Sequence, residues 1–213
     1  MPFSGKIYRG IQDATREERQ LIRSKIRVTH SSKVFQEYVE DAVSNTQTYK
    51  LAVKKSRVAG NGVFHMGRAD IPKGTVIAIY PGSVRVISDQ HGRRWNKFST
   101  YSIGIGAYDD GTDNLACKLE VIGAPSDDPY NAAQYNHSCV PNCVLELVDI
   151  KGGLSFQIVR TLRAIKPREE CRVDYEQDFW RPLSRIPPVR IGFRLVKCKC
   201  GQCRVPIGYV EPL

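Results

Sequence analysis

Three short segments carry the side chains whose types and spacing could do chemistry. Residues 136–143 read NHSCVPNC and place the amide of Asn136 beside the imidazole of His137, so one turn offers both groups to a small ligand. Tyr175, in an Asp-Tyr pair 38 residues after His137, adds a phenol. Three thiols gather near the end of the chain: Cys198, Cys200 and Cys203. Tetrahedral zinc takes four ligands, so these thiols lack one partner.

The Asn-His pair is weak evidence when it stands alone, because Asn and Ser side chains usually form hydrogen-bonded turns. Two upstream segments strengthen it. Residues 56–64 (SRVAGNGVF) contain Gly60 and Gly62, which have no side chain and let the backbone approach a ligand closely. A pair of ordinary turn glycines is the alternative reading of that segment. Residues 70–82 (DIPKGTVIAIYPG) follow, with a glycine turn and a strand that ends at Tyr80.

The order of these pieces resembles the SET-domain family of protein lysine methyltransferases. That family has a Gly-x-Gly segment, an Ile-x-x-Gly turn, a strand ending in Tyr-x-Gly, an Asn-His pair and a last strand leading into Asp-Tyr. The resemblance covers about residues 50–204. It implies a mainly β fold with some α, in which small β-sheets surround a pseudoknot formed by the Asn-His and Asp-Tyr segments.

The resemblance also implies S-adenosyl-L-methionine as cofactor and a lysine side chain as methyl acceptor. Six residues would bind the cofactor: Gly60, Asn61, Gly62, Asn136, His137 and Trp180. Tyr175 would be the catalytic phenol that orients the lysine amine, and Tyr80 would line the lysine channel. Core packing is the alternative reading of both tyrosines. An unperturbed lysine is only ~0.1% neutral near pH 7, a handicap of roughly 4 kcal/mol, which desolvation in a narrow channel would reduce.

The three tail thiols resemble the family's post-SET segment, whose fourth zinc ligand is the cysteine of Asn-His-Ser-Cys, here Cys139. Four thiolates imply one structural Zn²⁺, which would clip the tail across the active site. The family spacing is Cys-x-Cys-x4-Cys, whereas this chain has two residues before the last cysteine. Cys203 is the ligand that this departure affects. The remaining thiols read as small buried side chains: Cys117, Cys143 and Cys171.

The number of methyl groups transferred depends, in this family, on an aromatic residue beside the lysine nitrogen. The two positions that supply it in different relatives are occupied here by Val173 and Leu145, so neither adds a phenol. The resemblance therefore predicts di- or trimethylation. Two alternatives stay open. Another tyrosine could fill the same space: Tyr80, Tyr101 or Tyr135. Otherwise, both residues could be ordinary strand core.

The helices and strands that must position these residues can be predicted from the spacing of apolar residues and from the positions of Gly and Pro. Over residues 14–45 apolar positions recur at helical spacing, and Ser31-Ser32 predicts the start of a second helix. Over residues 51–81 and 93–123 the chain reads as short strands broken by Gly and Pro. The sequence therefore predicts three regions: a helical extension over residues 1–50, a SET domain over 51–181 and a post-SET-like zinc tail over 182–213.

The composition indicates the cellular compartment and the surface charge of the protein. The chain has 213 residues, no run of 18 apolar residues and no signal-peptide pattern, so we expect no membrane association. Seven cysteines without a signal peptide indicate a reducing compartment. The net charge of +10 is uneven. Residues 1–58 carry twelve Lys or Arg against six Asp or Glu, whereas residues 107–130 carry six acidic residues against Lys118 alone.

The charge distribution bears on partners. The basic N-terminal region predicts contact with a polyanion such as nucleosomal DNA, and the acidic segment could attract a basic, lysine-containing tail such as that of a histone. Ordinary solvated faces are the alternative for both. A histone substrate would place the protein in the nucleus. Two function classes remain: an active, histone-directed lysine methyltransferase, and a catalytically silent SET module that binds chromatin or protein partners. The intact Asn136-His137 pair together with Tyr175 favours the active enzyme.

Overall fold

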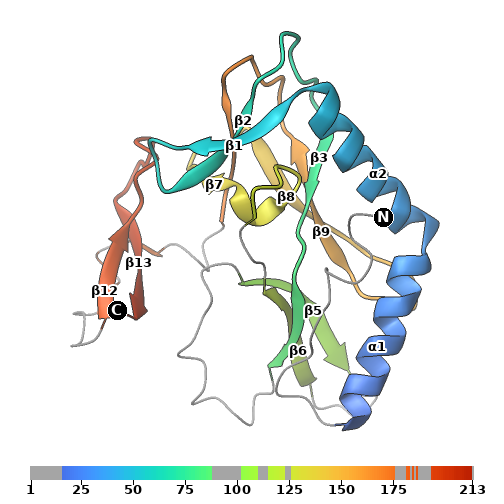
Figure 1. Cartoon of the computed structure of the whole chain (residues 1–213). Coiled ribbons are helices and arrows are strands. Elements are labelled where there is room, and N and C mark those ends of the chain that lie inside the picture. The colour runs from blue at the N-terminus through green and yellow to red at the C-terminus, as the bar shows by residue number, and fades with distance from the viewer. Residues whose placement is uncertain are drawn as a thin grey trace.

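The computed structural model describes most of the chain. The described residues are 16–87, 102–109, 115–122, 126–175, 181–182, 184, 186 and 193–212. Two helices come first and are followed by strands arranged in several small sheets, as Figure 1 shows. This architecture confirms the predicted mainly β fold with some α. Among the described residues, no helix has the length and apolar character needed to span a bilayer.

The two helices follow one another along one side of the molecule (Figure 1). Helix α1 covers Arg16–Ser31 and helix α2 covers Lys33–Thr48, with Ser32 between them. The predicted start of the second helix coincides with this break. Phe35 and Ala42 are buried in α2, on the apolar face that the helical spacing predicted.

Ring packing and two hydrogen bonds hold the helices against strand β9 (Phe156–Thr161). The Phe35 ring meets the Phe156 ring edge to face, with centroids 4.9 Å apart, a favourable arrangement for aromatic pairs. Thr29 Oγ1 in α1 donates to Leu154 O over 2.9 Å and accepts the Leu154 N–H over 2.7 Å. Both contacts lie at the start of β9. Helix α1 also reaches the main core, where Ile22 belongs to the cluster that contains Tyr135 and Val173.

The strands are short, as the frequent glycines and prolines predicted. They are β1 (Leu51–Lys55), β2 (Asn61–His65), β3 (Val76–Ile79), β4 (Ser83–Ile87), β5 (Ser102–Asp109), β6 (Leu115–Ile122), β7 (Asn136–His137), β8 (Cys143–Val148), β9, β10 (Glu170–Val173), β11 (Arg181–Pro182), β12 (Phe193–Lys197) and β13 (Ile207–Pro212). The predicted stretch 51–81 contains β1, β2 and β3. Within the stretch 93–123, β5 and β6 are formed, and the remaining residues lie outside the described part of the chain.

One sheet brings the predicted site together. Its strand order is β1-β2-β10-β7, and β10 pairs antiparallel with β2 and parallel with β7. Three further sheets have the orders β3-β9-β8, β4-β6-β5 and β11-β13-β12. The larger core cluster includes buried side chains of β2, β3, β8, β9 and β10, among them Val63 and Val173. The strands that carry the site are therefore backed by the main core.

Candidate active site

Strands β7 and β10 place the Asn-His and Asp-Tyr segments side by side. The strands pair in parallel, with Arg172 opposite Asn136 and Val173 opposite His137. Because parallel strands run in the same direction, the chain leaves both strands at one edge of the sheet. Tyr175, two residues after β10, therefore lies next to the turn that follows His137. The structure thus joins two segments that are far apart in the sequence.

The Asn136 amide ties the glycine segment to this sheet. Its Nδ2 atom donates to Ala59 O over 3.2 Å, to Asn61 O over 3.0 Å and to Glu170 Oε1 over 2.8 Å. An amide nitrogen carries two hydrogens, so these three acceptors share them. The sequence predicted Asn136 as a cofactor contact. In the structure its amide hydrogens are directed at protein oxygens and hold residues 59–61 against β10.

Each glycine of the Gly-x-Gly segment occupies a position where a side chain would clash or would strain the backbone. A β-carbon at Gly62 would overlap Glu170 Oε1 and stand 2.7 Å from Asn136 Nδ2. Gly60 has a φ of +46°, a backbone conformation that side chains disfavour. Asn61, between them, is exposed at the start of β2. A close approach is therefore present at Gly62, where the nearest groups are the Glu170 and Asn136 side chains. The predicted approach of this segment to a cofactor stays a prediction.

Glu170 is a site residue that the sequence reasoning missed. It is only 6% exposed, and its carboxylate accepts from Asn136 as well as from Arg172, whose Nε lies 2.9 Å and Nη2 2.6 Å from Oε2. A buried carboxylate needs such partners to remain charged. The signal available was the Glu-x-Arg spacing, because residues two apart in a strand share a face.

His137 is the residue through which the sheet contacts the thiols. Its Nε2 lies 3.2 Å from Cys139 Sγ, and its Nδ1 accepts the Tyr175 backbone N–H over 3.2 Å. Asp174 Oδ1 is 3.5 Å from the same Nδ1 atom. Burial lowers the pKa of His137, and the Asp174 carboxylate partly offsets this effect. Burial of the ring thus favours the neutral imidazole.

Tyr175 directs its hydroxyl at the backbone just before Asn136. The hydroxyl donates to Tyr135 O over 2.7 Å, and the Tyr175 ring centroid lies 5.4 Å from that of His137. Tyr175 is half-buried and packs on the core cluster that contains Tyr80, which is 7% exposed. The two tyrosines predicted for the lysine channel therefore border one apolar cluster.

The thiols of the tail come together with the cysteine of the Asn-His turn. Cys139 Sγ and Cys203 Sγ are 3.5 Å apart, as are Cys200 Sγ and Cys203 Sγ. The donor atoms of four residues lie within 4.8 Å of one another: His137, Cys139, Cys198 and Cys200. Cys203 thus contacts two other sulfurs despite its shorter spacing.

The thiols of the cluster differ in how readily they ionise. Burial opposes ionisation of Cys200, yet hydrogen bonds from the backbone N–H groups of Cys139 and Gln202 and from neighbouring thiols lower its pKa to about 7. Burial raises the pKa of Cys198 to about 12 and also raises that of Cys139. One sulfur is thereby stabilised as the thiolate, the form that binds metal. Thiolates favour zinc over hard cations such as Mg²⁺.

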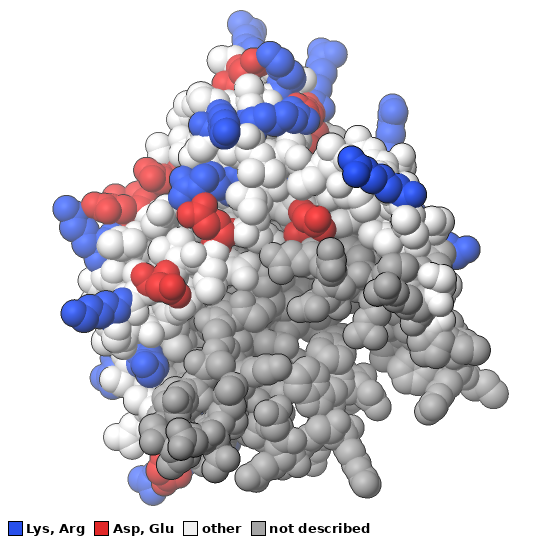
Figure 2. Space-filling view, turned by 180° about the vertical axis from the view of Figure 1, so that it is seen from behind, with Lys and Arg blue, Asp and Glu red and all other residues white. Residues whose placement is uncertain are grey.

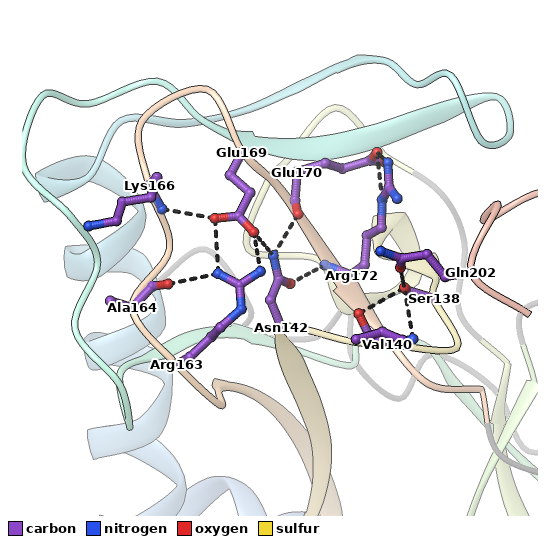
Figure 3. A network of polar contacts seen from close by, with 10 residues as sticks. All are labelled: Ser138, Val140, Asn142, Arg163, Ala164, Lys166, Glu169, Glu170, Arg172 and Gln202. Carbon is purple, nitrogen blue, oxygen red and sulfur yellow. Dashed lines mark hydrogen bonds and ion pairs between the residues drawn. The ribbon is translucent and has the colours of Figure 1, made fainter.

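A polar network fastens the Pro-Asn-Cys turn and the tail to β10 (Figure 3). Asn142 Nδ2 donates to Glu169 Oε1 over 3.0 Å and to Glu170 O over 2.9 Å, and Asn142 Oδ1 accepts the Arg172 N–H over 2.7 Å. In a separate group of bonds in the same view, Ser138 Oγ donates to Gln202 Oε1 in the tail over 2.8 Å. The Ser138 backbone N–H donates to Val173 O of β10 over 2.8 Å. The side-chain amide of Asn142 is therefore saturated by strand β10 and its approach.

The remaining predicted residues fall into two groups. Cys143 and Cys171 are fully buried, as expected for small core side chains. Trp180, predicted as a cofactor contact, and Tyr101, considered for the lysine channel, lie outside the described residues.

Charges of both signs lie on the surface. On the face shown in Figure 2, Lys and Arg side chains stand among Asp and Glu side chains over the described part of the chain. Helix α1 carries an excess of positive charge, with five Lys or Arg against two Glu.

Comparison with known proteins agrees with this geometry. The family model described as "SET domain" matches residues 60–176, more than half of the chain. The chain is 33% identical over 164 residues to histone-lysine N-methyltransferase trithorax of Drosophila virilis, a match that covers 74% of this chain and 4% of that protein. It is 28% identical over 152 residues to human histone-lysine N-methyltransferase 2D, a match that covers 70% of this chain and 2% of that protein. This protein thus spans only a small part of the length of these relatives, and by the matched residues it belongs to the SET-domain family.

Proposed function

We propose that this protein is an S-adenosyl-L-methionine-dependent protein-lysine N-methyltransferase that acts on a histone. The observation that carries the proposal is the parallel pairing of β7 with β10, which puts Tyr175 beside the Asn136-His137 pair. The names of the relatives, which are histone-lysine N-methyltransferases, support the choice of substrate.

The residues present fit the cofactor. S-adenosyl-L-methionine supplies a methyl group carried on a positively charged sulfonium. Gly60, Asn61 and Gly62 would hold it together with Asn136 and His137, because the Asn136 side chain bonds to Ala59 O and Asn61 O and keeps the glycine segment beside the Asn-His pair. The Gly62 position supports this assignment, since a side chain there would push the loop away from Asn136. Trp180 is proposed as a further contact on sequence grounds.

Tyr175 is proposed to orient the substrate lysine. Its phenol is held by Tyr135 O, so the oxygen has a fixed position from which its lone pairs can direct an amine. A channel beside the core cluster would exclude water and favour the neutral amine, which would offset part of the roughly 4 kcal/mol handicap. Fixed geometry contributes further, since positioning of reacting groups is worth about 7 to 11 kcal/mol. Tyr80 would line the same channel.

The tail is proposed to hold one structural zinc ion. Cys139, Cys198, Cys200 and Cys203 would supply four thiolates, the donor set of closed structural sites. The sulfur–sulfur contacts and the Ser138–Gln202 hydrogen bond already draw the tail to the Asn-His turn. Zinc would add binding energy to this arrangement.

We further propose that the product is di- or trimethyl-lysine. Val173 is 1% exposed in β10, and Leu145 in β8 packs on the same core cluster as Tyr175. Neither side chain carries a hydroxyl that could hold a partly methylated amine in place. The space next to Tyr175 would therefore accept an amine that already bears a methyl group.

The setting proposed for the reaction is the nucleus. A histone tail is the substrate, and the acidic segment 107–130 would attract its basic residues. The basic residues of α1 are proposed to contact nucleosomal DNA. The silent SET module is the competing function. The Asn136 Nδ2 group is the feature that favours it, because its hydrogens already bind protein oxygens.

A methyl-transfer assay separates the two functions. Zinc-loaded protein is incubated with radiolabelled S-adenosyl-L-methionine and with free histones, nucleosomes or no substrate, and nucleosome binding is measured in parallel. Label on histones supports the enzyme. Nucleosome binding without any transfer, in protein that binds no cofactor, supports the silent module.

A further inference from the structure

The His137 ring stands between the thiol cluster and the Tyr175 backbone. It is 4% exposed, with Nε2 at 3.2 Å from Cys139 Sγ and Nδ1 at 3.2 Å from Tyr175 N. Cys139 in turn contacts Cys203 at 3.5 Å. Each ring nitrogen therefore faces a different part of the site: the thiol cluster on one side and the Tyr175 segment on the other.

The partner of Nδ1 determines the hydrogen positions on the ring. A backbone N–H can only donate, so Nδ1 must accept when it binds Tyr175 N. A neutral imidazole carries one hydrogen, which then lies on Nε2. Nε2–H faces the Cys139 sulfur and donates to it. In this tautomer the nitrogen that faces the sulfurs has no lone pair left for a metal ion.

Asp174 is the group that would favour the opposite tautomer. Its Oδ1 atom lies 3.5 Å from Nδ1, and a carboxylate in that place is the usual partner of a metal-binding histidine. However, the Asp174 side chain is 53% exposed, so solvent screens its charge. Tyr175 N lies 3.2 Å from Nδ1, closer than Asp174 Oδ1 at 3.5 Å. The shorter contact with the backbone donor favours the tautomer with hydrogen on Nε2.

We propose that His137 is a positioning residue that links the zinc cluster to Tyr175, with Nε2–H donating to the zinc-bound Cys139 sulfur and Nδ1 accepting the Tyr175 N–H. The zinc ligands would then be the four cysteines, and the metal would affect the reaction only by holding Cys139 and, through it, the His137 ring. Zinc binding fixes Cys139, Cys139 fixes the ring, and the ring fixes the backbone of the catalytic tyrosine. This inference rests on two parts of the proposed function, the zinc ion held by the tail cysteines and the catalytic role of Tyr175.

The tautomer can be measured directly in the intact protein. Long-range ¹H–¹⁵N correlation spectra of the zinc-loaded chain report which nitrogen of each histidine is protonated, and the chain has only four histidines. We expect hydrogen on Nε2 of His137 and a bare Nδ1. In ¹¹³Cd-substituted protein we expect coupling of cadmium to cysteines alone. A His137 ring protonated on Nδ1, or coupled to cadmium through Nε2, would overturn the proposal.

Two substitutions separate the two hydrogen bonds of the ring. The amide of H137Q reaches the position of Nε2 but leaves Nδ1 without a counterpart, whereas the amide of H137N reaches the position of Nδ1 and leaves Nε2 without one. We expect H137N to weaken zinc binding by about 10- to 100-fold and H137Q to keep it within a few-fold of the wild type. For kcat the order should reverse, with H137Q the slower variant under saturating zinc.

The matched control is His65→Gln, which removes another fully buried imidazole, on β2, whose ring nitrogens contact Tyr49 O and Ala69 O. We expect it to lower the melting temperature without changing zinc affinity. Equal losses of zinc affinity and kcat in H137N and H137Q would contradict the linkage. If the tautomer and zinc results hold but no substrate is methylated, the linkage stands and the proposed function fails.

Discussion

The hydroxyl of Tyr175 donates to the backbone carbonyl of Tyr135 over 2.7 Å. This bond crosses between two segments that are 40 residues apart in the chain, and it holds the phenol at the residue that precedes Asn136. A phenol fixed in this way presents the same oxygen position in every molecule. The proposed role of Tyr175 depends on that fixed position.

Tyr175→Phe tests this role. Loss of the hydroxyl removes the group that orients the amine, so we expect kcat to fall by about 100-fold, while cofactor affinity stays within a few-fold of the wild type. Steady-state kinetics and a cofactor titration measure the two effects. Tyr38→Phe is the control, because its hydroxyl contacts only Arg160 among the described hydrogen bonds, away from the site. Wild-type rates in Tyr175→Phe would show that the assignment is wrong.

The second prediction concerns the metal. Purified protein should contain one zinc per chain, and Cys200→Ser should lose the metal together with most of the activity, because Cys200 is a proposed zinc ligand and its pKa is lowered to about 7. Elemental analysis measures both. Cys143→Ala, which removes a buried thiol outside the cluster, should retain zinc. Fully active protein without zinc would contradict this account.

The third prediction concerns the glycine segment. Gly62→Ala brings a methyl group against Glu170 Oε1 and Asn136 Nδ2, so we expect a loss of about 1 to 3 kcal/mol in unfolding free energy and weaker cofactor binding. Gly152→Ala is the control, since its φ of +75° strains the backbone but no atom lies within 4 Å of the new β-carbon. It should lose about 1 to 2 kcal/mol and bind cofactor normally. Equal cofactor affinity in both variants would refute the close-packed role of Gly62.

The sequence predicted the segments of the site better than their connections. The Asn-His pair, the Gly-x-Gly segment and the tail cysteines were recognisable because their residue types have few structural substitutes. The buried position of Glu170 was missed, because a charged residue in a strand reads as exposed until its tertiary partners are known. The meeting of the Asn-His and Asp-Tyr segments was expected from the family resemblance alone. Strands β7 and β10 are too short to carry a periodicity from which their parallel pairing could be predicted.

The fourth prediction concerns the product. Because Val173 and Leu145 offer no hydroxyl beside Tyr175, wild-type protein should add two or three methyl groups to its lysine. Val173→Tyr and Leu145→Tyr place a phenol near the amine and should shift the product toward monomethyl-lysine. A time course analysed by mass spectrometry measures the product distribution. A wild-type enzyme that stops at monomethyl-lysine with cofactor in excess would contradict the prediction.

The central claim is that this chain transfers methyl groups to lysine, and the most direct test is to identify the labelled residue. Zinc-loaded wild-type protein and Tyr175→Phe are incubated with radiolabelled S-adenosyl-L-methionine and histones, and the histones are then hydrolysed to amino acids. We predict label in N-methylated lysine with the wild type and little label with Tyr175→Phe. Zinc-loaded wild-type protein that binds cofactor but leaves no label on lysine in any histone would contradict the account.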